Sequence, residues 1–159
     1  MSELTHLDDS GAARMVDVAG KDVTVRTATA SGRVRVSPDV VALLRGAGVP
    51  KGDALAVARI AGIMGAKKVP DLVPLCHPIA LHGVEIDLRV TDEAVEITAT
   101  CRTADRTGVE MEALTAVSVA ALALFDMVKA VDPAAVIDGL QVESKTGGKT
   151  GDWRRPDDR

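Results

Sequence analysis

Two stretches of the chain alternate apolar and polar residues with a period of two, and a short polar segment separates them. Apolar side chains occupy every second position from 84 to 90 and again from 95 to 101. The segment between them carries Thr91-Asp92-Glu93, which suits a turn. A period of two is typical of strands with one buried face. The pattern therefore predicts an antiparallel hairpin.

Four further elements follow from the same kind of pattern. Alternation around a small-residue stretch predicts one long or interrupted strand over 23–36. Ser37-Pro38 then begins a short helix that ends at Gly46, because Ser is a favoured N-cap and Pro fits the first helical position. Apolar helices are predicted from about Asp53 to Lys68 and from Gly108 to Val131, the latter ending before a proline.

The remaining segments are a loop, a strand and a tail. Pro70, Pro74 and Pro78 predict an extended, rigid loop that carries Leu75, Cys76 and His77. A last strand over 137–144 leads into a glycine-rich tail.

Without the short helix, the order is strand, helix, strand, strand, helix, strand. That order is the split βαβ, ferredoxin-like motif. We therefore expect an α+β fold of βαββαβ order, with an antiparallel sheet, helices packed on one face and an extra short helix. The length of 159 residues suits a single domain over 1–159, with flexible ends at about 1–12 and 146–159.

Composition narrows the classes of function. Aromatic residues make up 1% of the chain, which excludes an aromatic stacking platform for single-stranded nucleic acid. The net charge of -4 gives no overall basic field for DNA or a membrane surface. No signal peptide or membrane-spanning run is recognised, and the two cysteines suit reduced thiols, so we expect a cytoplasmic protein.

The glycine-rich tail is the first candidate for chemistry. It ends like a phosphate-binding P-loop, but Glu143 stands where that motif needs glycine and no helix follows. A glycine loop that carries Lys145 and Lys149 could instead close over a phosphorylated ligand. The alternative is a C-terminus that is merely flexible and polar.

Asp126 and Lys129 form the second candidate, because they lie three residues apart near the end of the long helix and share one face. Their neighbours are apolar almost all round, which predicts shifted pKa values suited to proton transfer. The alternative is an ordinary surface ion pair.

Two glutamates open the same helix. Thr107 and Glu110 match a capping box, which gives Glu110 a structural role, and Glu112 follows it. Glu112 and Asp126 are 14 residues apart, or about 21 Å along a helix. If both act on one substrate, two subunits must meet at the active site.

Several other residues are ambiguous. His77 lies in the proline-stiffened loop, where it has either a structural role or the role of orienting a substrate. Lys51 precedes the first long helix and could point at a ligand near its N-terminus, or simply into solvent. Arg26 and Lys67 add positive charge with the same ambiguity.

Taken together, these segments resemble the cyclic pyranopterin monophosphate synthase family, the C protein of molybdenum cofactor synthesis. The resembling segments appear in the family's order and cover nearly the whole chain. They are Leu4-Thr5-His6, Met15-Val16-Asp17-Val18, Lys51-Gly52-Asp53, Ala58-Arg59-Ile60-Ala61-Gly62-Ile63, Leu75-Cys76-His77-Pro78, Thr107-Gly108-Val109-Glu110-Met111-Glu112-Ala113-Leu114-Thr115, Asp126-Met127-Val128-Lys129-Ala130 and Ser144-Lys145-Thr146-Gly147-Gly148-Lys149.

The resemblance implies a lyase that converts 3′,8-cyclo-7,8-dihydro-GTP to cyclic pyranopterin monophosphate and pyrophosphate. It implies a catalytic role for Asp126, with Lys51 and Lys129 as acid/base amines. It also implies a homohexamer, a trimer of dimers with active sites at subunit interfaces, and neither cofactor nor bound metal. The implied substrate-binding positions are Leu75, Cys76, His77, Met111 and Glu112.

The leaving pyrophosphate needs cationic stabilisation, for which we expect Arg26, Lys67, Lys145 and Lys149, with Glu110 also at the substrate site. Two other classes stay open. One is a non-catalytic ferredoxin-like module that binds a nucleotide. The other is a divalent-metal phosphohydrolase that uses Asp17, Glu110, Glu112 and His77.

Overall fold

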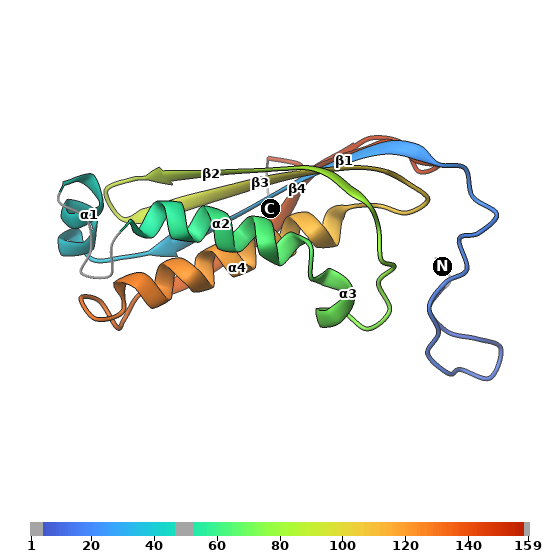
Figure 1. The fold of residues 1–159 in the computed structure, drawn as a ribbon, viewed down its shortest axis with the longest axis horizontal. Coiled ribbons are helices and arrows are strands. Elements are labelled where there is room, and N and C mark those ends of the chain that lie inside the picture. The colour runs from blue at the N-terminus through green and yellow to red at the C-terminus, as the bar shows by residue number, and fades with distance from the viewer. Residues whose placement is uncertain (1–4, 47–52, 158–159) are drawn as a thin grey trace.

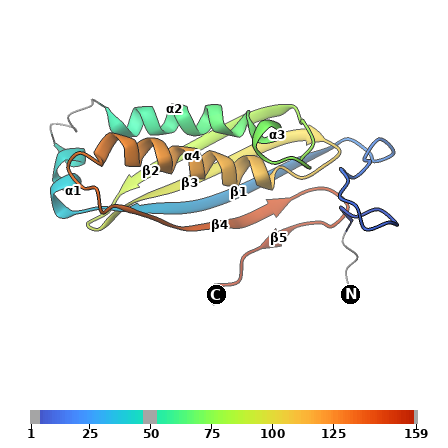
Figure 2. The same ribbon diagram turned by 90° about the horizontal axis from the view of Figure 1, so that it is seen from below.

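The computed structural model describes residues 5–46 and 53–157. These residues form a five-stranded antiparallel sheet with the long helices on one of its faces (Figures 1 and 2). The strands are β1 (Thr24–Arg35), β2 (Leu81–Val90), β3 (Ala94–Asp105), β4 (Val136–Thr146) and β5 (Trp153–Arg154). The helices are α1 (Pro38–Arg45), α2 (Ala54–Ala66), α3 (Val69–Leu72) and α4 (Glu110–Val128).

The sheet order is β2-β3-β1-β4-β5, and every neighbouring pair is antiparallel. The predicted ferredoxin-like order and the packing of both long helices on one face are confirmed, as is α1 as an extra helix (Figure 2). The prediction of a wholly extended segment after α2 is wrong, because α3 makes one helical turn there. Pro70 lies in the first turn of α3, where a missing N–H costs no hydrogen bond.

Side-chain caps begin α1 and α2, and the one at Ser37 confirms the prediction from the sequence. The Ser37 hydroxyl accepts a hydrogen bond from the Val40 N–H at 3.4 Å. The Asp53 carboxylate accepts one from the Ala56 N–H at 3.0 Å. Each cap satisfies an N–H group that has no partner within its own helix.

Small side chains fill the layer between the sheet and α4. Ala28, Ala30 and Val34 are buried on the inner face of β1, and α4 buries alanines along the side that meets them. By length and composition α4 is the one described helix that could cross a membrane, yet 56% of that stretch is buried inside the chain, as in a core helix. The small side chains allow the backbones of helix and sheet to approach closely.

Glycines bring α2 equally close to α4. A Cβ atom placed on Gly62 would lie 2.8 Å from the carbonyl oxygen of Ala116 and 2.4 Å from Cδ1 of Ile86. A Cβ atom on Gly65 would lie 2.7 Å from Cβ of Val119. Neither helix could keep its present position if these glycines carried a side chain.

We predict that Gly62→Ala lowers the free energy of unfolding by about 1–3 kcal/mol, because the added methyl group meets backbone that cannot move aside cheaply. Gly20→Ala is the matched control, since an added Cβ there has no atom within 4 Å. Urea unfolding at one fixed protein concentration measures both variants. Equal stability of the two variants would show that the helices are not in close contact at Gly62.

Candidate active site

A cavity of about 430 Å³ lies where β1 begins, β4 ends and α4 begins. Five segments line it: the N-terminal segment, the first residues of β1, the loop after α3, the first turn of α4 and the glycine loop after β4. The lining residues are Thr5, His6, Val16, Val18, Lys21, Arg26, Thr27, Leu75, Cys76, His77, Thr107, Gly108, Val109, Glu110, Met111, Glu112, Lys145, Thr146, Gly147, Lys149 and Thr150.

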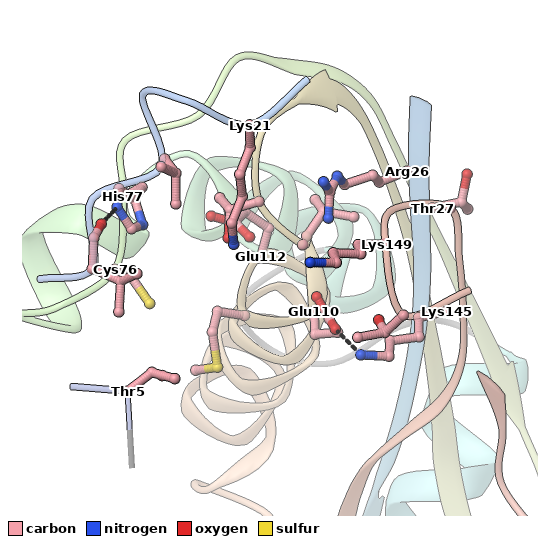
Figure 3. Close-up of a pocket in the computed structure, with 18 of the residues that line it drawn as sticks. Thr5, Lys21, Arg26, Thr27, Cys76, His77, Glu110, Glu112, Lys145 and Lys149 are labelled. Atoms are coloured by element: carbon pink, nitrogen blue, oxygen red, sulfur yellow. Dashed lines mark hydrogen bonds and ion pairs between the residues drawn. The ribbon is translucent and has the colours of Figure 1, made fainter. Parts of the chain in front are cut away.

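The cavity has two chemically different sides. Figure 3 shows Arg26, Lys145 and Lys149 together on one side, and Cys76 with His77 on the other. Glu112 lies between the two groups (Figure 3). Such a division suits a ligand with an anionic end and an uncharged, hydrogen-bonding end.

Glu112 is the buried carboxyl group of the cavity, with 3% of the residue exposed. Burial raises its pKa to about 7, and the charge of Glu110 adds to the rise. A carboxyl group with this pKa exchanges a proton near neutral pH, which suits general acid/base chemistry.

The charge of Glu112 contributes to the raised pKa of both cysteines. Burial raises the pKa of Cys101 to about 12, and the Glu112 charge adds to it. The pKa of Cys76, which lines the cavity, is raised by the same two causes in the same order. Cys76 therefore presents a neutral thiol rather than a nucleophilic thiolate.

The orientation of His77 is fixed by a hydrogen bond in which its Nε2–H donates to the carbonyl oxygen of Val16. A carbonyl can only accept, so Nε2 must carry the hydrogen. A neutral His77 ring therefore has Nδ1 as its acceptor. The same bond holds the N-terminal segment against the cavity.

The glycine loop after β4 packs against Arg26. Gly147 and Gly148 have φ values of +84° and +79°, which favour glycine. A Cβ atom on Gly148 would lie 2.4 Å from Nη1 of Arg26, and one on Gly147 would lie 2.2 Å from the Val25 carbonyl oxygen. The Arg26 Nε donates to the Asp105 carbonyl oxygen at 3.2 Å. Loop and guanidinium thus form one wall of the cavity.

The predicted capping box at the start of α4 is wrong. Val109 occupies the N-cap position without a side-chain cap. The Glu110 carboxylate instead forms an ion pair with Lys145, with Oε1 and Nζ 3.0 Å apart. A cation on the neighbouring strand competes successfully for this carboxylate.

The cavity gathers most of the substrate-binding residues that the sequence predicts. They are Leu75, Cys76, His77, Met111, Glu112, Glu110, Arg26, Lys145 and Lys149. Sequence reasoning missed Lys21, which lies three residues before β1 and so at the same end of the sheet as the start of β1. The spacing from Lys21 to Arg26 was visible in the sequence, but its meaning depended on the sheet order.

Asp126 and Lys129 lie at the opposite end of α4, about 21 Å from Glu112 along the helix. Their ion pair joins Oδ1 and Nζ at 2.6 Å, and the two side chains are 56% and 51% exposed. The prediction of an apolar setting is therefore wrong for the single chain. Their apolar neighbours, such as Leu124 and Val128, point to the buried side of the helix.

Of the two other predicted cations, one lies away from the cavity and one falls outside the described residues. Lys67 follows α2, is exposed and is not among the described residues that line the cavity. Lys51 lies outside the described residues. Within one chain, therefore, His77 and Lys129 do not share a cavity.

A metal centre built on Asp17 has little support in the geometry. The Asp17 carboxylate accepts a hydrogen bond from the Ala19 N–H at 2.8 Å, and Asp17 does not line the cavity with the two glutamates. Within residues 5–46 and 53–157, no three His, Cys, Asp or Glu side chains are grouped so that they could hold a metal ion.

We predict that wild-type stability falls relative to Glu112→Gln as the pH rises from about 4.5 to about 7. The raised pKa of Glu112 means that the folded protein keeps a proton which the unfolded chain has already lost, so the folded state is disfavoured above that range. The change should be on the order of 1–3 kcal/mol in the difference between the two unfolding free energies. Denaturant titrations at several pH values measure it, and a difference that stays constant with pH would contradict the assignment.

Comparison with known proteins places the chain in a family. Residues 15–148 match the MoaC family. The cyclic pyranopterin monophosphate synthase of Streptomyces coelicolor is 75% identical over 152 residues, covering 96% of this chain and 89% of the relative. The synthase of Nocardioides sp. is 71% identical over 156 residues, covering 96% of each chain. That of Corynebacterium glutamicum is 61% identical over 153 residues, covering 96% of this chain and 98% of the relative. The chain therefore belongs to the MoaC family.

Proposed function

We propose that this protein is a cyclic pyranopterin monophosphate synthase of molybdenum cofactor biosynthesis. It converts 3′,8-cyclo-7,8-dihydro-GTP to cyclic pyranopterin monophosphate and releases pyrophosphate. The name of its relatives supports the reaction. The observation that carries it is one cavity that combines Lys21, Arg26, Lys145 and Lys149 with the buried Glu112.

The cationic side of the cavity suits the triphosphate. Phosphate groups need positive charge in the ground state, and the departing pyrophosphate needs it more as the bond breaks. Arg26 offers a planar guanidinium fixed by its bond to Asp105, whereas Lys145 and Lys149 offer compact ammonium groups on a glycine loop. We assign the phosphate end of the substrate to these groups and to Lys21.

The other side of the cavity suits the pterin-forming ring system. Glu112 has a pKa of about 7, so near neutral pH both of its protonation states are populated. The protonated form can donate a hydrogen bond to a ring nitrogen, and the carboxylate can accept one from an amino group. His77 supplies an oriented ring, and Leu75, Cys76 and Met111 supply surface of low charge. We assign the purine-derived part of the substrate to these residues.

The acid/base residues Asp126 and Lys129, which the family resemblance implies, do not line the cavity of one chain. We propose that Asp126 and Lys129 are contributed by a neighbouring subunit, together with Lys67 and with Lys51 as a second acid/base amine. Asp126, Lys129 and Lys67 are exposed in the single chain and so are accessible to such a neighbour. An amine that becomes partly desolvated in this interface would have a lowered pKa, which suits alternating acid and base roles.

Apolar surface supports assembly into a homohexamer, a trimer of dimers. One side of α2 carries exposed apolar side chains, those of Val57, Ile60 and Met64. A groove of about 170 Å³ between α4 and β4 is lined in part by the exposed Leu122 and Leu140. Exposed apolar patches of this kind commonly mark subunit interfaces. We also propose a cytoplasmic location, where free cysteines such as Cys76 and Cys101 stay reduced.

Product analysis with the authentic cyclised GTP derivative tests the reaction. We expect one pyrophosphate to be released for each cyclic pyranopterin monophosphate formed. We also expect turnover to continue after a chelator has removed any divalent metal bound to the protein. Binding without turnover would favour a regulatory nucleotide-binding module, and complete loss on chelation would favour a metal phosphohydrolase.

The catalytic assignment is tested by Lys51→Ala, Asp126→Asn and Lys129→Ala. Each should lower kcat by at least about 100-fold while leaving the assembly intact, because each removes a proton-transferring group or its partner. Size-exclusion chromatography checks the assembly. Near-normal rates in all three variants would mean that the sites are wrong even if the reaction is right.

Mixed assemblies test whether two subunits share a site. Co-expressed Lys129→Ala and Lys145→Ala chains should regain about a quarter of wild-type activity, because half of randomly formed dimers are mixed and one of their two sites is then intact. Each variant expressed alone is the control. A mixture no more active than either variant alone would place all catalytic groups of a site in one chain.

A further inference from the structure

One of the cations that line the cavity, Lys145, already forms an ion pair with a carboxylate of the same cavity. Lys145 Nζ lies 3.0 Å from Glu110 Oε1, and both residues line the cavity (Figure 3). The two side chains are 35% and 27% exposed, so solvent still reaches them. The pair therefore lies where a ligand can displace one partner.

Gly108 makes room for this arrangement. A Cβ atom on Gly108 would lie 1.9 Å from Glu110 Oε2, so the carboxylate folds back over the Gly108 backbone. The φ angle of Gly108 lies outside the left-handed region, so alanine is compatible with the backbone there. An alanine would nevertheless push the Glu110 carboxylate away from its present position.

Glu110 conflicts with the ligand that the rest of the cavity suits. Among the described lining residues, Glu110 and Glu112 are the acidic ones, and burial raises the pKa of Glu112 towards neutrality. A phosphate chain brings several negative charges into this space, where the Glu110 charge repels it and also neutralises part of the Lys145 charge. A site selected only for tight phosphate binding would not keep a carboxylate here.

We propose that Glu110 is an exchangeable counter-ion of Lys145, which releases the ammonium group to the arriving phosphate and recovers it as pyrophosphate leaves. The inference rests on the proposed function in so far as pyrophosphate is the product. Glu110 then acts through Lys145 as a positioning residue. It holds the amine at the wall of the empty cavity and limits the affinity for the product.

Pyrophosphate affinity measured by isothermal titration calorimetry tests the exchange. We expect Glu110→Gln to bind inorganic pyrophosphate about three- to ten-fold more tightly than wild type, because the competing charge is gone while the side-chain size is kept. Product inhibition by pyrophosphate should strengthen by a similar factor. A merely structural role for Glu110 predicts weaker binding instead.

Glu96→Gln is the matched control, because it removes the same charge from a partly exposed ion pair with Arg89 on the sheet, away from the cavity. We expect it to leave pyrophosphate affinity unchanged. Gly108→Ala should tighten binding in the same direction as Glu110→Gln without a change of net charge.

A double-mutant cycle with Lys145→Gln decides whether the effect passes through Lys145. In that background Glu110→Gln should give a clearly smaller gain, because only the direct repulsion between Glu110 and the phosphate is then removed. A gain as large as in the wild-type background, or equal affinities of Glu110→Gln and Glu96→Gln, would overturn the inference. Product formation by wild type is measured separately, so the proposed function can stand even where this inference fails.

Discussion

Helix α4 packs against the sheet through alanines on one side and meets the glycines of α2 on another. This close contact fixes the direction of α4 relative to the strands and to α2, because the alanines and glycines leave little space between the backbones. The first turn of α4 consequently lies where β1 begins and β4 ends. The cavity, with segments from five parts of the chain, exists because of that alignment.

The cavity has cationic side chains, which attract anions such as phosphate, and a carboxyl group that can exchange a proton. Lys21, Arg26, Lys145 and Lys149 give the cavity a local positive field in a chain whose overall charge is -4. Burial nevertheless raises the pKa of Glu112 to about 7. The cavity thus combines a cluster of cationic side chains with a carboxyl group that can exchange a proton near neutral pH.

The geometry of a single helix separates two groups of functional residues. Glu112 lies in the first turn of α4, and Asp126 with Lys129 lies at its last turn, on solvent-exposed surface. A straight helix cannot bring its two ends together, which is why the proposal of a shared site requires a second subunit. The exposed apolar side chains of α2 and of the α4–β4 groove provide surface for that contact.

Much of the local structure was determined by the sequence alone. Alternation at 84–90 and 95–101 predicted the β2–β3 hairpin, and Ser37 predicted where α1 begins. Both signals depend on neighbouring residues only. The order of elements was enough to predict the ferredoxin-like sheet. The sequence also predicted nine residues that line the cavity, of which eight lie in the resembling segments and Arg26 was chosen for its positive charge.

Other features were decided only by the tertiary structure. Thr107 and Glu110 have the spacing of a capping box, but Lys145 arrives from a strand 35 residues further on and takes the carboxylate. Asp126 and Lys129 have apolar neighbours in sequence, but those neighbours face inward while the ion pair faces solvent. Lys21 joined the site only because the sheet order brings the start of β1, the end of β4 and the start of α4 to one cavity. In each case the partner is distant in sequence, and a pattern of neighbouring residues contains no information about which distant side chain will reach it.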